Sequence, residues 1–187
     1  MQSEILTVGH STHEIERFLA LLSGAGVEVV ADVRRFPGSR RHPQFGADAL
    51  ERSLRDEGIA YESFRDELGG RRSRKDLAAG GGGTPPDNSA WRNASFRAYA
   101  DYMSTPAFAD GLERLEETAR GRRSSVMCAE AHPSRCHRRL IADMLLARGW
   151  RVVHLLPDGR LQDHAFTPDA VVEARRVHYP AQPSLDV

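Results

Sequence analysis

The sequence contains few cysteines, a single lysine and no long apolar run, and the first and last of these shortages each exclude a class of protein. Two cysteines among 187 residues are too few for the disulfide framework of a small secreted domain. No stretch of about 18 apolar residues exists, so no helix is expected to span a membrane. Residues 1–10 also lack the basic flank and long apolar segment of a secretion signal. We therefore expect a protein of the reducing cytoplasm that has no membrane partner.

The formal net charge of the chain is zero, since it contains 26 Lys and Arg residues and 26 Asp and Glu residues. No global field therefore favours nucleic acid or a cationic partner. Lys75 is the only lysine in this set, and the other basic residues are arginines. A GC-rich genome can produce that bias, but guanidinium groups also favour bidentate contacts to phosphate or carboxylate. The composition leaves both explanations open.

Apolar runs and helical periodicities alternate along the chain. The apolar runs predict strands at 5–9, 27–33, 59–64, 124–128 and 150–156. Helical spacing predicts helices at 11–24, 46–58, 96–103, 105–119 and 134–149. This alternation is typical of an α/β fold, and we expect a three-layer sandwich around a mostly parallel, Rossmann-like sheet of about five strands. The simplest right-handed topology has strand order 3-2-1-4-5, with the first and fourth strands adjacent.

Local signals indicate where some helices begin. Ser11 and Glu14 match a capping box, in which each side chain satisfies a free backbone amide of the other residue. Thr105 and Pro106 predict an N-cap followed by proline at the first helical position. The same pattern at 167–168 predicts a last helix that ends near residue 175.

We expect residues 1–178 to form a single domain with one irregular segment. Residues 71–92 include a basic run, four consecutive glycines and two consecutive prolines. Such a composition buries too little apolar surface to offset its ordering entropy, which predicts a flexible insertion, either a lid or a variable loop. Residues 179–187 contain two more prolines and are expected to form a poorly ordered tail.

The densest set of reactive side chains lies at 125–139, between a predicted strand and the helix after it. Both cysteines are here, together with Glu130 and His137. Cys136 and His137 are predicted to lie in the first turn of that helix, where free amides and the positive end of the dipole favour a bound anion or a thiolate. Spacing relative to Leu140 predicts that His137 points toward the sheet, and Arg138 could bind phosphate or carboxylate through two hydrogen bonds.

Three such segments are expected at one edge of the sheet: 9–12, 32–41 and 128–138. Ligands of open parallel sheets bind beyond the carboxyl ends of the strands, where the strand order reverses. We therefore predict that His10, Asp32, Arg34, Cys128 and Glu130 lie close together. The candidate catalytic residues are Cys128, Glu130, His10, Asp32 and His137. The candidate phosphate-binding residues are Ser11, Arg34, Ser39, Arg40 and Arg138.

Each candidate also has a purely structural interpretation. His10 could hydrogen-bond a turn, and Asp32 could anchor a loop through backbone amides. Arg40 and Arg41 could form a solvated face, and Cys128 could be an inert residue of the core.

Spacing argues against two familiar sites. In cysteine phosphatases, the loop that holds phosphate has about five residues between its cysteine and its arginine. Here six residues separate Cys128 from Arg135, and neither serine nor threonine follows this arginine. Structural zinc sites commonly use ligands two to four residues apart. Cys128, Glu130, Cys136 and His137 could supply mixed metal ligands, although adjacent ligands in one helix are awkward. A bound metal stays open as an alternative.

The order of short motifs resembles the bacterial "domain of unknown function 488" family. The motifs are Thr7-Val-Gly-His-Ser-Thr12, Asp32-Val-Arg34, Phe36-Pro-Gly-Ser-Arg40, Pro43-Gln-Phe45, Leu68-Gly-Gly70, Tyr99-Ala-Asp-Tyr-Met103, Met127-Cys-Ala-Glu130 and Cys136-His-Arg138. The resemblance covers nearly the whole chain but implies no reaction, since the family's name states none. It implies a shared site at His10, Ser11, Asp32, Arg34, Ser39, Arg40, Cys128, Glu130, Cys136, His137 and Arg138, and a variable part at Arg71–Ser89.

Three functions are compatible with these residues. The first is a cytoplasmic enzyme that acts on a phosphate-bearing substrate, either a nucleotide or a nucleic acid. The second is a metal-dependent enzyme that uses the same Cys, His and Glu side chains as ligands. The third is a non-catalytic module that binds an anionic ligand or nucleic acid through its arginines, with an affinity that falls steeply with salt.

Overall fold

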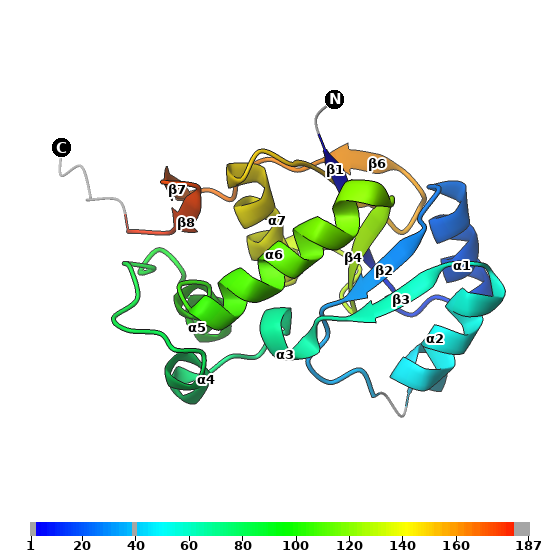
Figure 1. The fold of residues 1–187 in the computed structure, drawn as a ribbon, viewed down its shortest axis with the longest axis horizontal. Coiled ribbons are helices and arrows are strands. Elements are labelled where there is room, and N and C mark those ends of the chain that lie inside the picture. The colour runs from blue at the N-terminus through cyan, green and yellow to red at the C-terminus, as the bar shows by residue number, and fades with distance from the viewer. Residues whose placement is uncertain (1–2, 39–40, 182–187) are drawn as a thin grey trace.

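The computed structural model describes residues 3–38 and 41–181, and its centre is a six-stranded sheet with helices around it (Figure 1). Along the chain the elements are β1 (Glu4–Gly9), α1 (Ile15–Gly24), β2 (Val29–Asp32), η1 (Pro43–Phe45), α2 (Ala47–Asp56), β3 (Ala60–Ser63), α3 (Arg65–Leu68), α4 (Arg74–Ala79), α5 (Ala94–Tyr102), α6 (Pro106–Gly121), β4 (Ser124–Cys128), η2 (Pro133–Arg135), α7 (Arg138–Ala147), β5 (Arg151–Leu155), β6 (Leu161–Asp163), β7 (Val171–Glu173) and β8 (Arg176–His178).

Five strands run parallel in the order β3-β2-β4-β1-β5, and β6 adds an antiparallel edge beside β5. The predicted mostly parallel sheet is confirmed, as is the adjacency of β1 and β4. The predicted order 3-2-1-4-5 and the count of five strands are wrong, because β4 pairs with both β1 and β2 and separates them. A right-handed crossover can pass over one strand position, and apolar periodicity does not determine which position a later strand takes.

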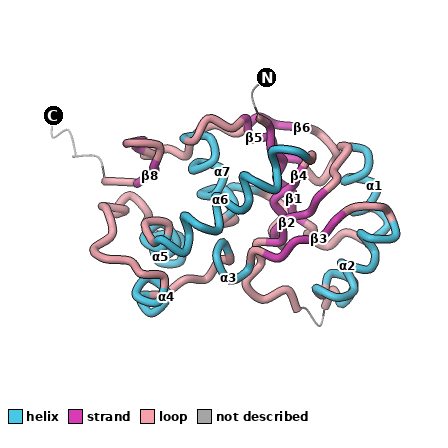
Figure 2. Tube along the Cα trace, viewed as in Figure 1, coloured by secondary structure: helices cyan, strands magenta, loops and turns pink. Residues whose placement is uncertain are grey.

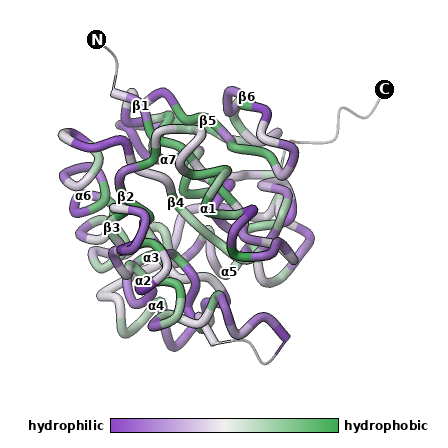
Figure 3. Tube along the Cα trace, turned by 90° about the vertical axis from the view of Figure 1, so that its right-hand side faces the viewer, coloured by the Kyte–Doolittle hydropathy of each residue, from purple (hydrophilic) through white to green (hydrophobic). Residues whose placement is uncertain are grey.

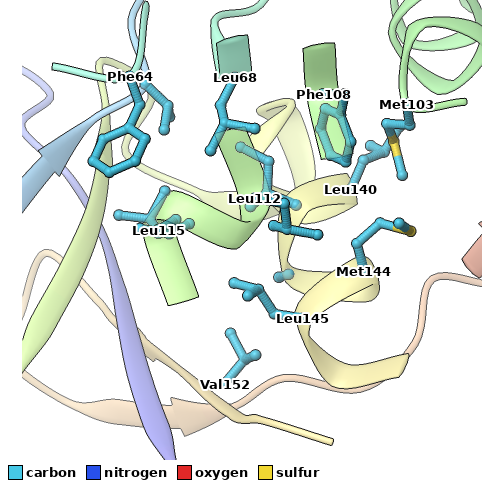
Figure 4. Packing of buried hydrophobic residues seen from close by; sticks show 14 of the residues in the cluster. Phe64, Leu68, Met103, Phe108, Leu112, Leu115, Leu140, Met144, Leu145 and Val152 are labelled. Atoms are coloured by element: carbon cyan, nitrogen blue, oxygen red, sulfur yellow. The ribbon is translucent and has the colours of Figure 1, made fainter. Parts of the chain in front are cut away.

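Helices cover both faces of the sheet, and each face has its own apolar core (Figure 2). Helices α1 and α2 pack over one face, while α5, α6 and α7 pack over the other, where Leu112, Leu140 and Val152 meet (Figure 4). Hydrophobic residues concentrate along the central strands (Figure 3). Within the described residues, no helix combines the length and the apolar character that a membrane span requires.

The predicted last helix at 167–175 is wrong, because β7 and β8 form a two-stranded hairpin there. The turn residues Ala174 and Arg175 both have positive φ, at 47° and 64°. Hairpin turns of this kind usually contain Asn or Gly, so the sequence carried no turn signal. The backbone amide of Thr167 donates to the Asp143 carboxylate at 2.9 Å instead of beginning a helix.

Of the three helix starts predicted from local signals, the one at Thr105 is confirmed, and those at Ser11 and Thr167 are wrong. Thr105 caps α6 by accepting a hydrogen bond from the Phe108 amide, and Pro106 follows it at the first helical position. The capping box at Ser11 and Glu14 does not form, since α1 begins at Ile15 without a side-chain cap. Ser11 has a φ of 49° and its amide donates to the Ala129 carbonyl, which places it in a turn that joins β1 to the loop after β4.

The segment at 71–92 contains α4 and is attached to the domain near its end. Asn88 is buried, and its side-chain amide donates to Asp101 while its side-chain oxygen accepts from the Tyr179 backbone amide. The flexibility of this insertion and the order of the tail stay predictions, and residues 182–187 lie outside the described residues. Tyr179 itself is buried in the core, and its hydroxyl donates to Asp143 at 2.8 Å.

Candidate functional site

A pocket of about 410 Å³ lies at the carboxyl end of β4. Its walls are the loop after β2, residues 70–71, the first turns of α5, the end of β4 and the segment before α7. A larger pocket of about 690 Å³ lies between α6 and the β7–β8 turn, but its described lining contains neither cysteine nor histidine. We therefore place the candidate site in the smaller pocket, where the predicted reactive segments meet.

Cys128, Cys136 and His137 form a compact cluster in the wall of this pocket. The two sulfur atoms and the His137 Nδ1 all lie within 4.8 Å of one another. Nδ1 is 3.9 Å from the Cys128 Sγ and 3.8 Å from the Cys136 Sγ. Cys136 and His137 precede α7 rather than lying in its first turn as predicted, because the short helix η2 comes first.

The ring of His137 is fixed by its neighbours. Its Nε2 is 3.1 Å from the carbonyl oxygen of Val33, and because a carbonyl only accepts, Nε2 must be the donor. In a neutral ring this leaves the lone pair of Nδ1 facing the two sulfurs. Tyr99 packs against the ring at 4.9 Å. The backbone of Gly70 is so close to the His137 ring that a Cβ at this position would be 2.7 Å from Nδ1.

The environment of Cys128 favours a thiolate. A hydrogen bond from the Cys136 thiol, followed by the effects of His137 and Arg138, holds the pKa of Cys128 well below its usual value. Burial, followed by the hydrogen bond to Cys128 and the negative charge of that neighbour, raises the pKa of Cys136 well above its usual value. Neither cysteine forms a disulfide, although both are buried. Cys128 therefore belongs both to the buried core and to a polar cluster of thiol and imidazole groups.

A second polar cluster, formed by His10, Asp32, Arg34 and Tyr61, lies beside the first. Asp32 accepts from the Arg34 backbone amide at 2.9 Å and from its guanidinium, with the shortest contact at 2.6 Å. The Tyr61 hydroxyl donates to the same carboxylate at 2.8 Å. Arg34 also donates to His10 Nε2 and to the Phe45 carbonyl oxygen. Of the four, only Arg34 lines the pocket. Asp32 therefore serves as the counter-charge of the buried Arg34 guanidinium.

The guanidinium of Arg138 is also hydrogen-bonded within the protein. It is 1% exposed, and its guanidinium donates to the backbone carbonyls of Glu130 and Ala131. These contacts bind the loop after β4 to α7. Phosphate binding by Arg34 and Arg138 stays a prediction, but a phosphate would have to displace these protein acceptors.

The other predicted residues are spread around this edge. The exposed Glu130 lines the pocket, while the Ser11 carbonyl oxygen accepts from His10 Nδ1. Ser39 and Arg40 lie outside the described residues. His10 is joined to β4 through its backbone amide, which donates to the Cys128 carbonyl oxygen at 3.0 Å. The predicted residues thus meet at one edge, but as two clusters with different surroundings.

Several pocket residues were not among the candidates from sequence: Arg35, Phe36, Gly70, Arg71, Phe96, Tyr99 and Arg135. Phe36, Gly70 and Tyr99 belong to motifs of the family resemblance, which was the only signal for them. Arg71 begins the irregular insertion, where composition indicates mobility rather than a site. The spacing between Cys128 and Arg135, which does not match that of a cysteine phosphatase, gave no signal that Arg135 lines a pocket.

Gly9 makes a close approach that a side chain would block. A Cβ at this position would lie 1.8 Å from the Glu130 carbonyl oxygen and 2.9 Å from an Arg138 guanidinium nitrogen. We expect Gly9→Ala to lower the free energy of unfolding by about 1–3 kcal/mol, since backbone must move to relieve the overlap. Gly24→Ala is the control, because a Cβ there meets nothing within 4 Å and alanine favours helix. Equal stability of both variants in urea unfolding would contradict this account of the loop.

Comparison with known proteins yields one match. A family model described as "Domain of unknown function DUF488" matches residues 14–145, which include β2, β4 and both cysteines. No curated protein and no solved structure matches the chain.

Proposed function

The chain belongs to the DUF488 family, and because that family's description assigns no function, we propose one from the pocket: an enzyme of the reducing cytoplasm that acts on a phosphate-bearing substrate, either a nucleotide or a nucleic acid. The observation that carries this proposal is that one pocket combines exposed guanidinium groups, an exposed aromatic ring and the Cys128, Cys136 and His137 cluster.

The anion-binding groups of the proposed site are Arg71 and Arg135. Both are exposed and line the pocket, and within the described part of the chain neither guanidinium has an ion-pair partner. Arg35 also lines the pocket, but its guanidinium pairs with Asp76. Unpaired guanidinium groups are suited to phosphate because they donate in a planar fork. Arg71 and Arg135, rather than the buried Arg34 and Arg138, are therefore the proposed phosphate contacts.

Aromatic side chains support a nucleotide over a simple phosphate. Phe36 is 66% exposed at the pocket, an unusual position for a large apolar ring. The guanidinium of Arg35 lies 5.7 Å from the centre of this ring. Phe96 also lines the pocket and stacks on Trp91 with ring centres 4.8 Å apart. A base could stack on such a ring, a contact that tolerates any base.

The reacting groups would come from the end of β4. Cys128 and His137 lie in the pocket wall with Cys136, and the exposed Glu130 is within the same lining. Glu130 is suited to proton transfer, which contributes about 10²–10⁴-fold to rates when a side chain is well placed. His10 and Asp32 do not line the pocket, so the proposal gives them a supporting role through Arg34.

The proposal is tested by binding and turnover on a defined panel. We expect nucleoside mono- and diphosphates or short single-stranded oligonucleotides to bind, with an affinity that falls as salt rises. Arg71→Gln with Arg135→Gln should weaken binding by at least about 10-fold, because each charged hydrogen bond contributes about 1.5–3 kcal/mol. Calorimetry or fluorescence polarisation measures the affinity. Cys128→Ala and Glu130→Gln should each lower turnover of the bound compound.

Arg55→Gln is the matched control, since Arg55 is exposed on α2 and lies outside the pocket lining. Unchanged affinity in the double arginine variant would contradict the proposed phosphate site. Binding without turnover of any panel compound would favour the non-catalytic module. Full turnover in both Cys128→Ala and Glu130→Gln would contradict the proposed reacting groups.

A further inference from the structure

We propose that Cys128, Cys136 and His137 hold a single transition-metal ion of the zinc type, with one coordination position open toward the pocket. The inference rests on the proposed function in one respect, since it supplies the reactive centre of the same pocket. Its ligand geometry is argued independently of the substrate.

The three ligand atoms already have nearly the spacing of a metal site. Zinc binds thiolate at about 2.3 Å and imidazole nitrogen at about 2.0 Å in a tetrahedron, which places sulfur and nitrogen about 3.5 Å apart. The His137 Nδ1 lies 3.9 Å and 3.8 Å from the two sulfurs, and all three atoms lie within 4.8 Å of one another. The two nitrogen–sulfur distances thus exceed the tetrahedral value by only a few tenths of an ångström.

The surroundings orient the ligands as metal sites require. Metal-binding histidines almost always donate their other ring N–H to a carboxylate, a backbone carbonyl or water. His137 Nε2 donates to the Val33 carbonyl oxygen at 3.1 Å, which directs the lone pair of Nδ1 toward both sulfurs. The Arg138 backbone amide lies 3.5 Å from the Cys136 Sγ, where it supports a thiolate.

The local backbone also removes the objection that adjacent ligands are awkward in one helix. Cys136 is extended, with φ −130° and ψ 143°, and His137 is the N-cap of α7. The two side chains therefore leave the backbone before the helix begins and can converge. Cys128 lies at the end of β4, eight residues before Cys136 in the chain, and so reaches the cluster from another element. A sequence-spacing rule for ligands within a helix does not apply to this arrangement.

The donor set indicates both the metal and its role. Two thiolates and one imidazole favour zinc among the common divalent ions, whereas magnesium and calcium prefer oxygen. Three protein ligands leave a fourth tetrahedral position, as in catalytic rather than structural zinc sites. All three residues line the pocket of about 410 Å³, so a water or a substrate oxygen could take that position. The metal would then act as a Lewis acid or lower the pKa of a bound water.

Metal analysis of untagged protein, purified with its thiols reduced and without chelators, tests the inference. We expect about one zinc ion per chain, and the apoprotein should rebind one equivalent of zinc in competition with a chromophoric chelator. Cobalt(II) in the apoprotein should give a thiolate-to-cobalt charge-transfer band. Cys136→Ser and His137→Gln should each weaken zinc binding by more than the roughly 10–100-fold that loss of an outer-shell partner costs.

His132→Gln is the matched control, because His132 is exposed in the same loop and is outside the pocket lining. Circular dichroism of each variant shows whether the fold persists, and zinc titration of the unaltered apoprotein needs no variant at all. Reduced, folded apoprotein that takes up no zinc would overturn the inference, as would equal zinc affinity in Cys136→Ser and His132→Gln. If the two cysteines are found as a disulfide on purification, and the protein still binds no zinc after that disulfide is reduced, the inference is also overturned.

The metal site and the proposed function can fail separately. If zinc does not bind but the arginine variants still weaken nucleotide binding, the metal inference falls while the phosphate site stands. If zinc binds with one equivalent but Arg71→Gln with Arg135→Gln leaves nucleotide affinity unchanged, the proposed substrate class falls while the metal site stands.

Discussion

Replacement of Asp32 by alanine is expected to lower the free energy of unfolding by about 3–5 kcal/mol, because it leaves a buried guanidinium without its counter-charge. Asp32 is 1% exposed and Arg34 is 6% exposed. The carboxylate accepts from the Arg34 amide, from its guanidinium and from the Tyr61 hydroxyl. The total stability of a domain is about 5–15 kcal/mol, so the variant would be close to unfolding at room temperature. Guanidinium chloride unfolding at 25 °C measures the change.

Two further variants make the Asp32 experiment decisive. Glu51→Ala removes a carboxylate that pairs with Arg55 at 3.2 Å on the exposed side of α2, and this change should cost less than about 1 kcal/mol. Asp32→Leu combined with Arg34→Met removes both buried charges and should recover part of the lost stability. A similar loss in Asp32→Ala and Glu51→Ala would show that the buried pair is not a main support of this edge.

Acidification is expected to destabilise the fold between pH 6.5 and 4.5, through two buried histidines. Burial, followed by the charge of Arg34, lowers the pKa of His10 to about 4. Burial, followed by the charge of His164, lowers the pKa of His154 to about 3. Both rings are therefore neutral in the folded protein, while the unfolded chain binds protons from about pH 6.5 downward. Stability is fully present above that pH and is lost as pH falls toward the folded pKa values.

The hydrogen bonds explain why these rings stay neutral. Nδ1 of His10 donates to the Ser11 carbonyl oxygen, so Nε2 must accept from Arg34. The buried His154 ring has polar neighbours on both sides, with Nδ1 2.7 Å from the Thr7 hydroxyl oxygen and Nε2 3.0 Å from His164 Nδ1, and His164 Nε2 donates to Asp143. A proton added to His10 would place an N–H against the Arg34 guanidinium, and one added to His154 would place a positive charge in a buried site beside His164 and Arg138.

The unfolded ring is half protonated at pH 6.5, so the expected loss rises toward about 1.4 kcal/mol per pH unit and amounts to about 2 kcal/mol for each histidine between pH 6.5 and 4.5. Urea unfolding at several pH values in this range measures the slope. His154→Gln should lower stability at pH 7 but make the pH dependence shallower, because one of the two groups is gone. His132→Gln, at an exposed site, should keep the slope of the unaltered protein. An unchanged slope in His154→Gln would contradict the assignment.

The sequence by itself determined the class of the fold and the edge at which the site lies. Apolar runs of five or so residues separated by helical periodicities predict an α/β fold, because strands and helices bury their apolar residues at different spacings. Polar residues that follow the strands must gather where the strands end, so Asp32, Cys128 and His10 could be assigned to one edge. The resemblance to the DUF488 family was likewise visible in short motifs and is confirmed by the match over residues 14–145.

The tertiary structure alone decided the strand order, the hairpin at 171–178 and the division of the site. Strand β4 lies between β1 and β2 because of pairing across long chain separations, which no local pattern encodes. Because of the same long-range packing, the guanidinium groups of Arg34 and Arg138 donate to protein acceptors, whereas the exposed Arg71 and Arg135 line the pocket. Only the extended backbone of Cys136 brings its sulfur beside His137 and Cys128, since ligand convergence depends on backbone direction rather than on spacing along the chain.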